Sequence, residues 1–260
     1  MYLRNQCAVN RSQPAPAGRR LVALVALLLA CLIALPVMAE DDPFPKVSQV
    51  SFPDHPAPFV PILTKPVPAE YFYDAVLVGD SLSEGFRLSN ALPDITVLAK
   101  IGQSAGGIMT TRSYKLDGKK VKLQEYLHSL NPGKIYLWVG SNGIDQFKVS
   151  HIVPQYAKML DMLVTEFPDT VIYCMSLAPI IESRARKQYP NYTNKKIVEF
   201  NKELVRLAGE RNCYYLGVHE VLVDEKGALK SAFSAGDGIH MKQEGYQQVA
   251  EYLMRNALTK

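Results

Sequence analysis

The chain has 260 residues, of which 48% are hydrophobic and 21% are charged, and its formal net charge is +4. This length and composition are ordinary for a globular protein with one good-sized domain and additional segments. The positive excess comes from four arginines in residues 1–39, a segment without acidic residues. Because the remainder is neutral, the charge balance excludes any electrostatic reason to expect nucleic acid or an anionic surface as a partner.

Residues 1–39 have the pattern of an export signal. Arg19 and Arg20 precede an apolar run over 21–35, and the small-residue sequence Val37-Met38-Ala39 follows it. We expect cleavage after Ala39 and a secreted or extracytoplasmic location. The alternative is an uncleaved membrane anchor at the cell surface, because residues 21–39 are uncharged and just long enough to span a bilayer.

A proline-rich segment follows the leader. Eight prolines lie between residues 43 and 68, a density that predicts an extended linker over 40–69 without a core of its own. The folded domain is therefore expected to occupy residues 70–260.

Strand-like and helix-like segments alternate from residue 75 onward. Apolar runs typical of strands cover residues 75–78, 95–99, 135–139, 171–177 and 214–218. Helical periodicity is clearest in residues 152–167, 197–208 and 246–257. This alternation predicts an α/β fold in which right-handed crossovers build a parallel sheet with helices on both faces.

The cysteines and histidines give no sign of a metal site or a disulfide framework. Cys7 and Cys31 lie in the leader, whereas Cys174 and Cys213 lie in apolar strand-like runs. We interpret this later pair as buried thiols, and no metal-ligand spacing links them to the five histidines. No metal or other cofactor is expected.

Two short polar motifs stand where strands are expected to end. Gly79-Asp80-Ser81 follows the strand over 75–78, and Asp237-Gly238-Ile239-His240 lies beyond the last strand. Parallel α/β sheets bind their ligands at the carboxyl ends of strands. A serine there can be a nucleophile, and an Asp three residues before a His can supply an orienting carboxylate and a general base. The sequence thus predicts a serine hydrolase with Ser81, Asp237 and His240 as catalytic residues.

Two further motifs follow strand-like runs, Gly102-Gln103-Ser104-Ala105 and Val139-Gly140-Ser141-Asn142. Together the four motifs resemble the SGNH hydrolase superfamily, also called GDSL esterases and lipases, over about residues 70–258. The resemblance implies a three-layer, flavodoxin-like parallel sheet of about five strands in the order 2-1-3-4-5. It also implies an oxyanion hole made by the backbone N–H groups of Ser81 and Gly102 and the side-chain amide of Asn142.

Three assignments around these motifs stay open. Gly106 takes the place of Gly102 if the second motif carries its glycine farther along, as in other family members. Asn142 can instead serve a turn with Gly143, because the family usually has Asp directly after its Asn, and here Asp145 comes later. Asp80 is expected to point away from the nucleophile and to have a supporting hydrogen-bond role.

A competing nucleophile is Ser104, because residues 102–106 also spell the G-x-S-x-G elbow of α/β-hydrolases. That elbow requires a helix directly after it. Gly106-Gly107 and the polar stretch over 110–113 are poor helix openings, so we do not expect a helix there and prefer Ser81.

The sequence therefore predicts an exported, metal-independent serine esterase that works through an acyl-enzyme, in particular on O-acetyl groups of cell-wall or extracellular carbohydrate. Residues 182–196 form a basic loop with two tyrosines after the fourth strand, which could grip a glycan or acidic substrate at the cleft rim. The alternatives are an O-acyltransferase that passes the acyl group to a glycan hydroxyl, a lysophospholipase- or thioesterase-type lipid esterase, and a non-catalytic binding module.

Overall fold

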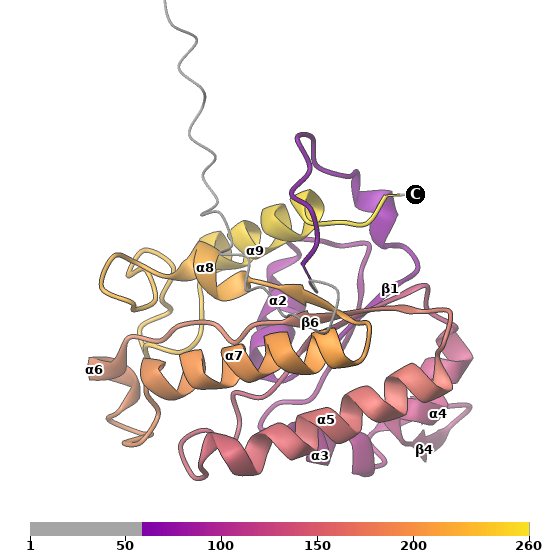
Figure 1. Ribbon diagram of the computed structural model, residues 1–260, viewed down its shortest axis with the longest axis horizontal. Coiled ribbons are helices and arrows are strands. Elements are labelled where there is room, and N and C mark those ends of the chain that lie inside the picture. The colour runs from indigo at the N-terminus through magenta and orange to yellow at the C-terminus, as the bar shows by residue number, and fades with distance from the viewer. Residues whose placement is uncertain (1–58, 260) are drawn as a thin grey trace, which may run out of the picture. The chain divides into compact units, whose positions relative to one another are not determined.

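Five parallel strands form the centre of the structure, a computed structural model that describes residues 59–259 (Figure 1). They are β1 (Ala75–Gly79), β2 (Thr96–Ala99), β5 (Lys134–Trp138), β6 (Val171–Met175) and β7 (Tyr214–Leu216). Their order across the sheet is β2-β1-β5-β6-β7, with parallel pairing throughout. This confirms the predicted order 2-1-3-4-5 for the five strands of this sheet. All five residues of β1 are buried, as expected for a central strand with both faces covered.

Helices lie on both faces of this sheet, which confirms the predicted three layers. They are η1 (Ala69–Phe72), α2 (Ser81–Ser89), α3 (Ala105–Thr110), α4 (Leu123–Leu130), α5 (Val149–Glu166), α6 (Glu182–Ala185), α7 (Asn194–Glu210), α8 (Val218–Leu222) and α9 (Gln243–Arg255). The helices predicted over 152–167, 197–208 and 246–257 correspond to α5, α7 and α9.

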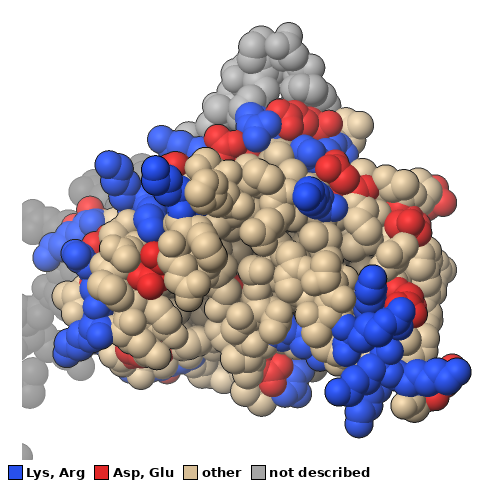
Figure 2. Space-filling view, turned by 90° about the horizontal axis from the view of Figure 1, so that it is seen from below, with Lys and Arg blue, Asp and Glu red and all other residues tan. Residues whose placement is uncertain are grey.

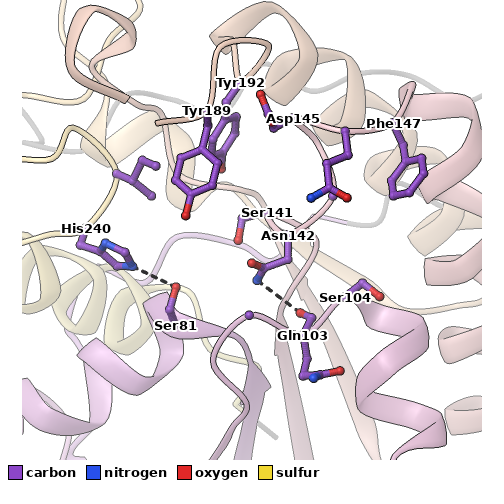
Figure 3. Close-up of a pocket in the computed structure, with 14 residues that line it drawn as sticks. Ser81, Gln103, Ser104, Ser141, Asn142, Asp145, Phe147, Tyr189, Tyr192 and His240 are labelled. Carbon is purple, nitrogen blue, oxygen red and sulfur yellow. Dashed lines mark hydrogen bonds between the residues drawn. The ribbon is translucent and has the colours of Figure 1, made fainter. Parts of the chain in front are cut away.

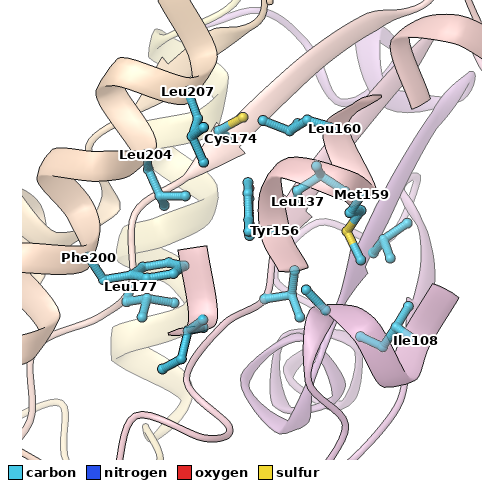
Figure 4. Packing of buried hydrophobic residues seen from close by; sticks show 14 of the residues in the cluster. Ile108, Leu137, Tyr156, Met159, Leu160, Cys174, Leu177, Phe200, Leu204 and Leu207 are labelled. Atoms are coloured by element: carbon cyan, nitrogen blue, oxygen red, sulfur yellow. The ribbon is translucent and has the colours of Figure 1, made fainter. Parts of the chain in front are cut away.

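The two faces of the sheet have separate apolar cores. On one face α3, α4, α5 and α7 pack against the strands, and Figure 4 shows Tyr156 of α5 beside Phe200 of α7, with their ring centroids 5.8 Å apart. On the other face η1, α2, α8 and α9 cover the sheet. There Phe86 of α2 packs edge-on against Trp138 at 6.4 Å. Two buried cores on opposite faces hold the strand ends, and hence the polar loops, in fixed positions.

A short hairpin outside the main sheet was not predicted. It consists of β3 (Tyr114–Leu116) and β4 (Lys119–Val121), joined by Asp117 and Gly118 with φ of 48° and 76°. Asp-Gly is a strong hairpin signal because both residues tolerate positive φ. The hairpin and its flank also carry exposed lysines, namely Lys115, Lys119, Lys120 and Lys122. Figure 2 shows basic side chains gathered at the end of the molecule where the hairpin lies.

The packed domain begins earlier than Glu70. Val60 and Val67 are buried, and the N–H groups of Leu63 and Val67 donate to the carbonyl oxygens of Arg255 and Met254 at 2.7 and 2.8 Å. The last part of the segment predicted as a free linker over 40–69 is therefore attached to the end of α9. Prolines are compatible with this attachment because an extended segment at an edge does not need every N–H.

The predicted leader over 1–39 and most of the linker lie outside the described residues. Within residues 59–259 no helix is both long and apolar enough to cross a bilayer. Cys174 and Cys213, which were interpreted as buried thiols, are free and buried in the described domain.

Candidate active site

Ser81 is the first residue of α2, directly beyond the carboxyl end of β1. Asp80 caps this helix by accepting a hydrogen bond from the N–H of Leu82 at 3.1 Å. Gly79 has no room for a side chain, because a Cβ there would lie 2.3 Å from the carbonyl oxygen of Trp138. The chain can therefore turn from strand to helix at this point only with glycine, and the turn presents Ser81 at the sheet edge.

The structure brings Ser81, His240 and Asp237 into one hydrogen-bonded relay, of which Figure 3 shows the contact between His240 and Ser81. His240 Nε2 is 3.0 Å from Ser81 Oγ, and His240 Nδ1 is 2.6 Å from Asp237 Oδ2. The other oxygen of Asp237 accepts the N–H groups of Ile239 and His240, both at 2.9 Å. Partial burial raises the pKa of Asp237, but the hydrogen bond from the His240 ring and those from the two N–H groups lower the pKa further, to a value below its usual range.

The loop that carries Asp237 and His240 is held against α6. The N–H of Ile181 donates to the carbonyl oxygen of Gly238 at 2.8 Å. Gly238 has a φ of +84°, and a Cβ there would meet the carbonyl oxygen of Ile181 at 2.6 Å. Glycine between Asp237 and His240 thus satisfies both a left-handed backbone and a close contact with the neighbouring chain.

Gly102 and Asn142 line the same cleft as Ser81 and His240. The Asn142 side chain donates from Nδ2 to the carbonyl oxygen of Gln103 at 3.3 Å, which joins the loop after β5 to the loop after β2. Gly102 has a φ of +75°. Gly106, the alternative to Gly102, lies inside α3 and does not line this cleft.

The expectation that no helix would follow Ser104 was wrong. Helix α3 begins at Ala105, and Ser104 caps it by accepting the N–H of Gly107 at 3.2 Å. The helix forms despite its two glycines because Ile108 is fully buried against the core. His240 pairs with Ser81, while the Ser104 side chain lies on the far side of Gln103 in Figure 3.

Asp80 connects the turn between β1 and α2, which we call the nucleophile loop, to the loop that carries Asn142. Its side chain is buried, and the hydroxyl of Ser141 donates a short hydrogen bond to it. Burial raises the pKa of Asp80 above its usual range, although the hydrogen bonds from Ser141 and Leu82 act in the opposite direction. The predicted supporting position of this carboxylate agrees with these contacts, whose partner Ser141 the sequence did not identify.

The cleft has a volume of about 330 Å³ and mixes polar with aromatic side chains. Tyr189 and Tyr192 belong to residues 182–196, which were predicted to lie at the cleft rim. In Figure 3 the Tyr189 side chain points into the cleft between His240 and Asn142. Asp145 and Phe147 were not predicted as lining residues. Asp145 accepts a hydrogen bond from the N–H of Asn191 at 2.6 Å. This bond connects the loop after β5 to the loop that carries Tyr189 and Tyr192, which we call the tyrosine loop. The one sequence signal for Asp145 was its position two residues after Gly143, close to the place where the family usually has an Asp.

Metal-binding geometry is not found in the part of the chain that the structure describes. Over residues 59–259 no group of three or more His, Cys, Asp or Glu side chains is arranged to hold a metal ion. The relay of Ser81, His240 and Asp237 is itself sufficient for proton transfer to and from a serine hydroxyl.

Comparisons with known proteins agree with this architecture. Residues 77–248 match the GDSL-like Lipase/Acylhydrolase family, a segment that spans β1 to α9 and includes all four motifs. No curated protein gives a significant sequence match.

Among solved structures, a GDSL-like lipase from Bacteroides thetaiotaomicron is 18% identical with a TM-score of 0.56 over 70% of this chain and 86% of its own. A protein from Streptococcus pneumonia, described as a candidate platelet activating factor, is 22% identical with a TM-score of 0.57 over 69% and 81%. At these identities the two structures support the fold. With the family match over most of the folded domain, the chain belongs to the GDSL-like lipase/acylhydrolase family and is a serine ester hydrolase.

Proposed function

We propose that this protein is an exported esterase that removes O-acyl groups, acetyl groups in particular, from cell-wall or extracellular carbohydrate. The observation that carries the catalytic part is the relay in which His240 lies 3.0 Å from Ser81 Oγ and 2.6 Å from Asp237. The leader pattern over residues 1–39 supports export. The polar and aromatic cleft supports a sugar as the alcohol part of the ester.

In the first half of the reaction, Ser81 Oγ attacks the ester carbonyl carbon while His240 Nε2 accepts the hydroxyl proton. Asp237 holds the Nδ1–H tautomer of the ring and stabilises the imidazolium that forms. His240 then gives this proton to the departing sugar oxygen, so that the C–O bond of the ester breaks and the acyl group stays on Ser81. The sugar leaves as a neutral alcohol.

The negative charge that develops on the carbonyl oxygen needs donors in a fixed position. We assign this role to the N–H groups of Ser81 and Gly102 and to the Asn142 amide. One hydrogen of the Asn142 amide is used by the Gln103 carbonyl at 3.3 Å. This bond orients the amide and leaves its second hydrogen for the substrate oxygen.

Water completes the cycle in the second half. His240 removes a proton from a water molecule that attacks the acyl carbon. As the bond between the acyl carbon and Ser81 Oγ breaks, His240 returns this proton to Oγ, which releases the free acid and regenerates Ser81. The half-exposed His240 and Asp237 side chains, at 43% and 46% exposure, support ready access of water to this position.

The proposal is tested with p-nitrophenyl acetate and O-acetylated glycans, using wild type and Ser81→Ala. We expect release of acetate from both substrate types by wild type and from neither by Ser81→Ala. Product analysis with an added glycan acceptor separates hydrolysis from transfer, because an O-acyltransferase would give an acylated sugar in place of free acetate. Turnover by Ser81→Ala at the wild-type rate would overturn the proposed mechanism.

Export is tested separately, on the protein recovered from cells. We expect the mature chain to begin at Glu40, as determined by mass spectrometry of the extracytoplasmic fraction. Recovery of a chain that still carries Met1 in the membrane fraction would instead identify residues 1–39 as an uncleaved membrane anchor.

A further inference from the structure

A second depression adjoins Ser81 and His240, next to the cleft described above, which we call the polar cleft. It has a volume of about 480 Å³ and is lined by large, mainly apolar side chains together with Gly85 and the polar residues Ser81, Glu84, Ser89, His240 and Gln243. The large side chains are Leu88, Ile101, Met241 and Tyr246. We call it the apolar groove, and it shares only Ser81 and His240 with the polar cleft.

The groove follows one face of α2. Ser81, Gly85 and Leu88 are spaced four and three residues apart, and residues at this spacing lie in a row along a helix. A Cβ on Gly85 would lie 1.9 Å from the Tyr246 hydroxyl, so glycine at this position lets Tyr246 pack directly against the helix. From Ser81 to Leu88 the helix rises by about 10 Å.

Large apolar side chains are exposed along this row. Leu88 is 69% exposed and Ile101 is 71% exposed, among the highest values for large hydrophobic residues in the described domain. Scattered exposed hydrophobic residues are normal on a protein surface. Leu88 and Ile101, however, line the same groove, Leu88 on the helix that begins with Ser81 and Ile101 in the loop after β2.

The charge at the groove is locally compensated. Glu84, the acidic residue of its lining, is 2.6 Å from Arg87 in an ion pair one turn along the helix. Burial of an aliphatic chain beside Leu88 and Ile101 therefore leaves no unpaired carboxylate at this wall.

We propose that the apolar groove binds the acyl chain of the ester, while the polar cleft binds its alcohol part. This inference rests on the proposed function and specifies its substrate class. An acyl group bonded to Ser81 Oγ would extend along α2 toward Leu88. Because C–C bonds of about 1.5 Å advance an extended chain by roughly 1.25 Å each, a 10 Å groove holds about eight carbons. Acetyl esters occupy the end next to Ser81, and acyl groups up to about octanoyl gain further contacts.

The test uses p-nitrophenyl esters from acetate to octanoate, which differ in acyl length and share one leaving group. Each buried methylene is expected to raise kcat/KM by about two- to fourfold until the groove is filled. Leu88→Ser and Ile101→Thr are expected to lower kcat/KM for octanoate by about tenfold and to leave that for acetate within twofold. Leu130→Ser is the matched control, because Leu130 is an exposed leucine at the end of α4, away from both depressions.

Two results would overturn the inference. One is a flat dependence on acyl length in wild type, and the other is an equal effect of Leu88→Ser on acetate and octanoate. A series of alkyl acetates from ethyl to octyl gives the reverse test, since dependence on alcohol length that Leu88→Ser removes would place the leaving group in the groove. Failure of the proposed function itself is distinct, because then Ser81→Ala would change none of these rates.

Discussion

The loops after β1 and β2 both carry predicted site residues, but the core holds them differently. After β1, a Cβ on Gly79 would lie 1.9 Å from Ser83 Oγ as well as close to the Trp138 carbonyl oxygen, and the next residue, Asp80, is buried. After β2, no heavy atom of the described residues outside its chain neighbours lies within 4 Å of the Cβ position of Gly102. Glycine is favoured there by the φ of +75° alone.

This difference separates two ways of placing a catalytic group. The nucleophile loop is fixed by close packing, so its position follows from the core and cannot shift without disturbing the fold. The loop after β2 is fixed by its backbone conformation and by contacts at its surface, such as the bond from Asn142 to Gln103. A side chain added at Gly79 should therefore cost more folding stability than one added at Gly102.

The sharpest comparison uses the serine in each loop, and it has the largest expected effect. Ser81→Ala and His240→Ala should each lower kcat by at least about 10⁴-fold, and the double variant should be little worse because the two groups act as a unit. Ser104→Ala should keep most of the activity, since Ser104 caps α3. Ester hydrolysis by purified variants measures this, and loss in Ser104→Ala with retention in Ser81→Ala would reverse the nucleophile assignment.

The two glycines give the next effect, on stability. Gly79→Ala should lower the free energy of unfolding by about 3 kcal/mol, because the Trp138 backbone cannot move away cheaply. Gly102→Ala should lower it by only about 1 kcal/mol, the cost of a left-handed non-glycine residue. Denaturant unfolding of both variants checks the values. Equal losses would mean that the loop after β1 is no more tightly held than the loop after β2.

Asn142 bonds from the loop after β5 to the loop after β2, and its replacement should affect activity alone. Asn142→Ala should lower kcat by about 100-fold with little change in KM, as expected for loss of an oxyanion donor. The thermal midpoint should stay close to that of wild type. Unchanged kcat with a lowered midpoint would instead assign Asn142 to the turn before Gly143.

Asp80→Asn is expected to have the smallest effect, about tenfold in kcat, because the amide keeps the shape while it weakens the link to Ser141. Its pH dependence tests burial directly. Burial raises the folded-state pKa of Asp80, so the protonated form favours folding, and this contribution is lost in wild type as the pH rises above the usual carboxyl range near 4. As the pH rises from about 4 to neutrality, the thermal midpoint of wild type should therefore fall relative to that of Asp80→Asn. The same pH dependence of the midpoint in both proteins would contradict a raised pKa for Asp80.

Much of the fold could be predicted because its signals are local. Central strands such as β1 and β5, which are buried along all or nearly all of their length, appear as continuous apolar runs, and α5, α7 and α9 appear as regular apolar faces. The Asp237 and His240 pairing was also foreseeable, since both lie in one short loop. Their contact with Ser81 depends on sheet order, which came from the family resemblance.

Other features depend on tertiary contacts that no local pattern reports. Helix α3 packs against α5 and buries Ile108 completely, which overrides the weak helix propensity of its two glycines. Phe147 lines the cleft because the loop after β5 turns toward the tyrosine loop, a geometry fixed by the Asp145 contact with Asn191. The attachment of Leu63 and Val67 to the end of α9 likewise needs the far end of the chain to be in place.

That attachment keeps Leu63 and Val67 away from the active site. Helix α9 starts at the catalytic edge near His240 and runs back by about 20 Å, so Met254 and Arg255 lie at the opposite edge beside Leu63 and Val67 (Figure 1). Phe59 pairs with Tyr215 of the edge strand β7, so the described chain runs from this edge of the sheet to the end of α9 that lies away from His240. No residue of the described segment 59–67 lines the polar cleft or the apolar groove, so this segment supports the end of α9 and leaves the approach of a polymer to Ser81 unobstructed.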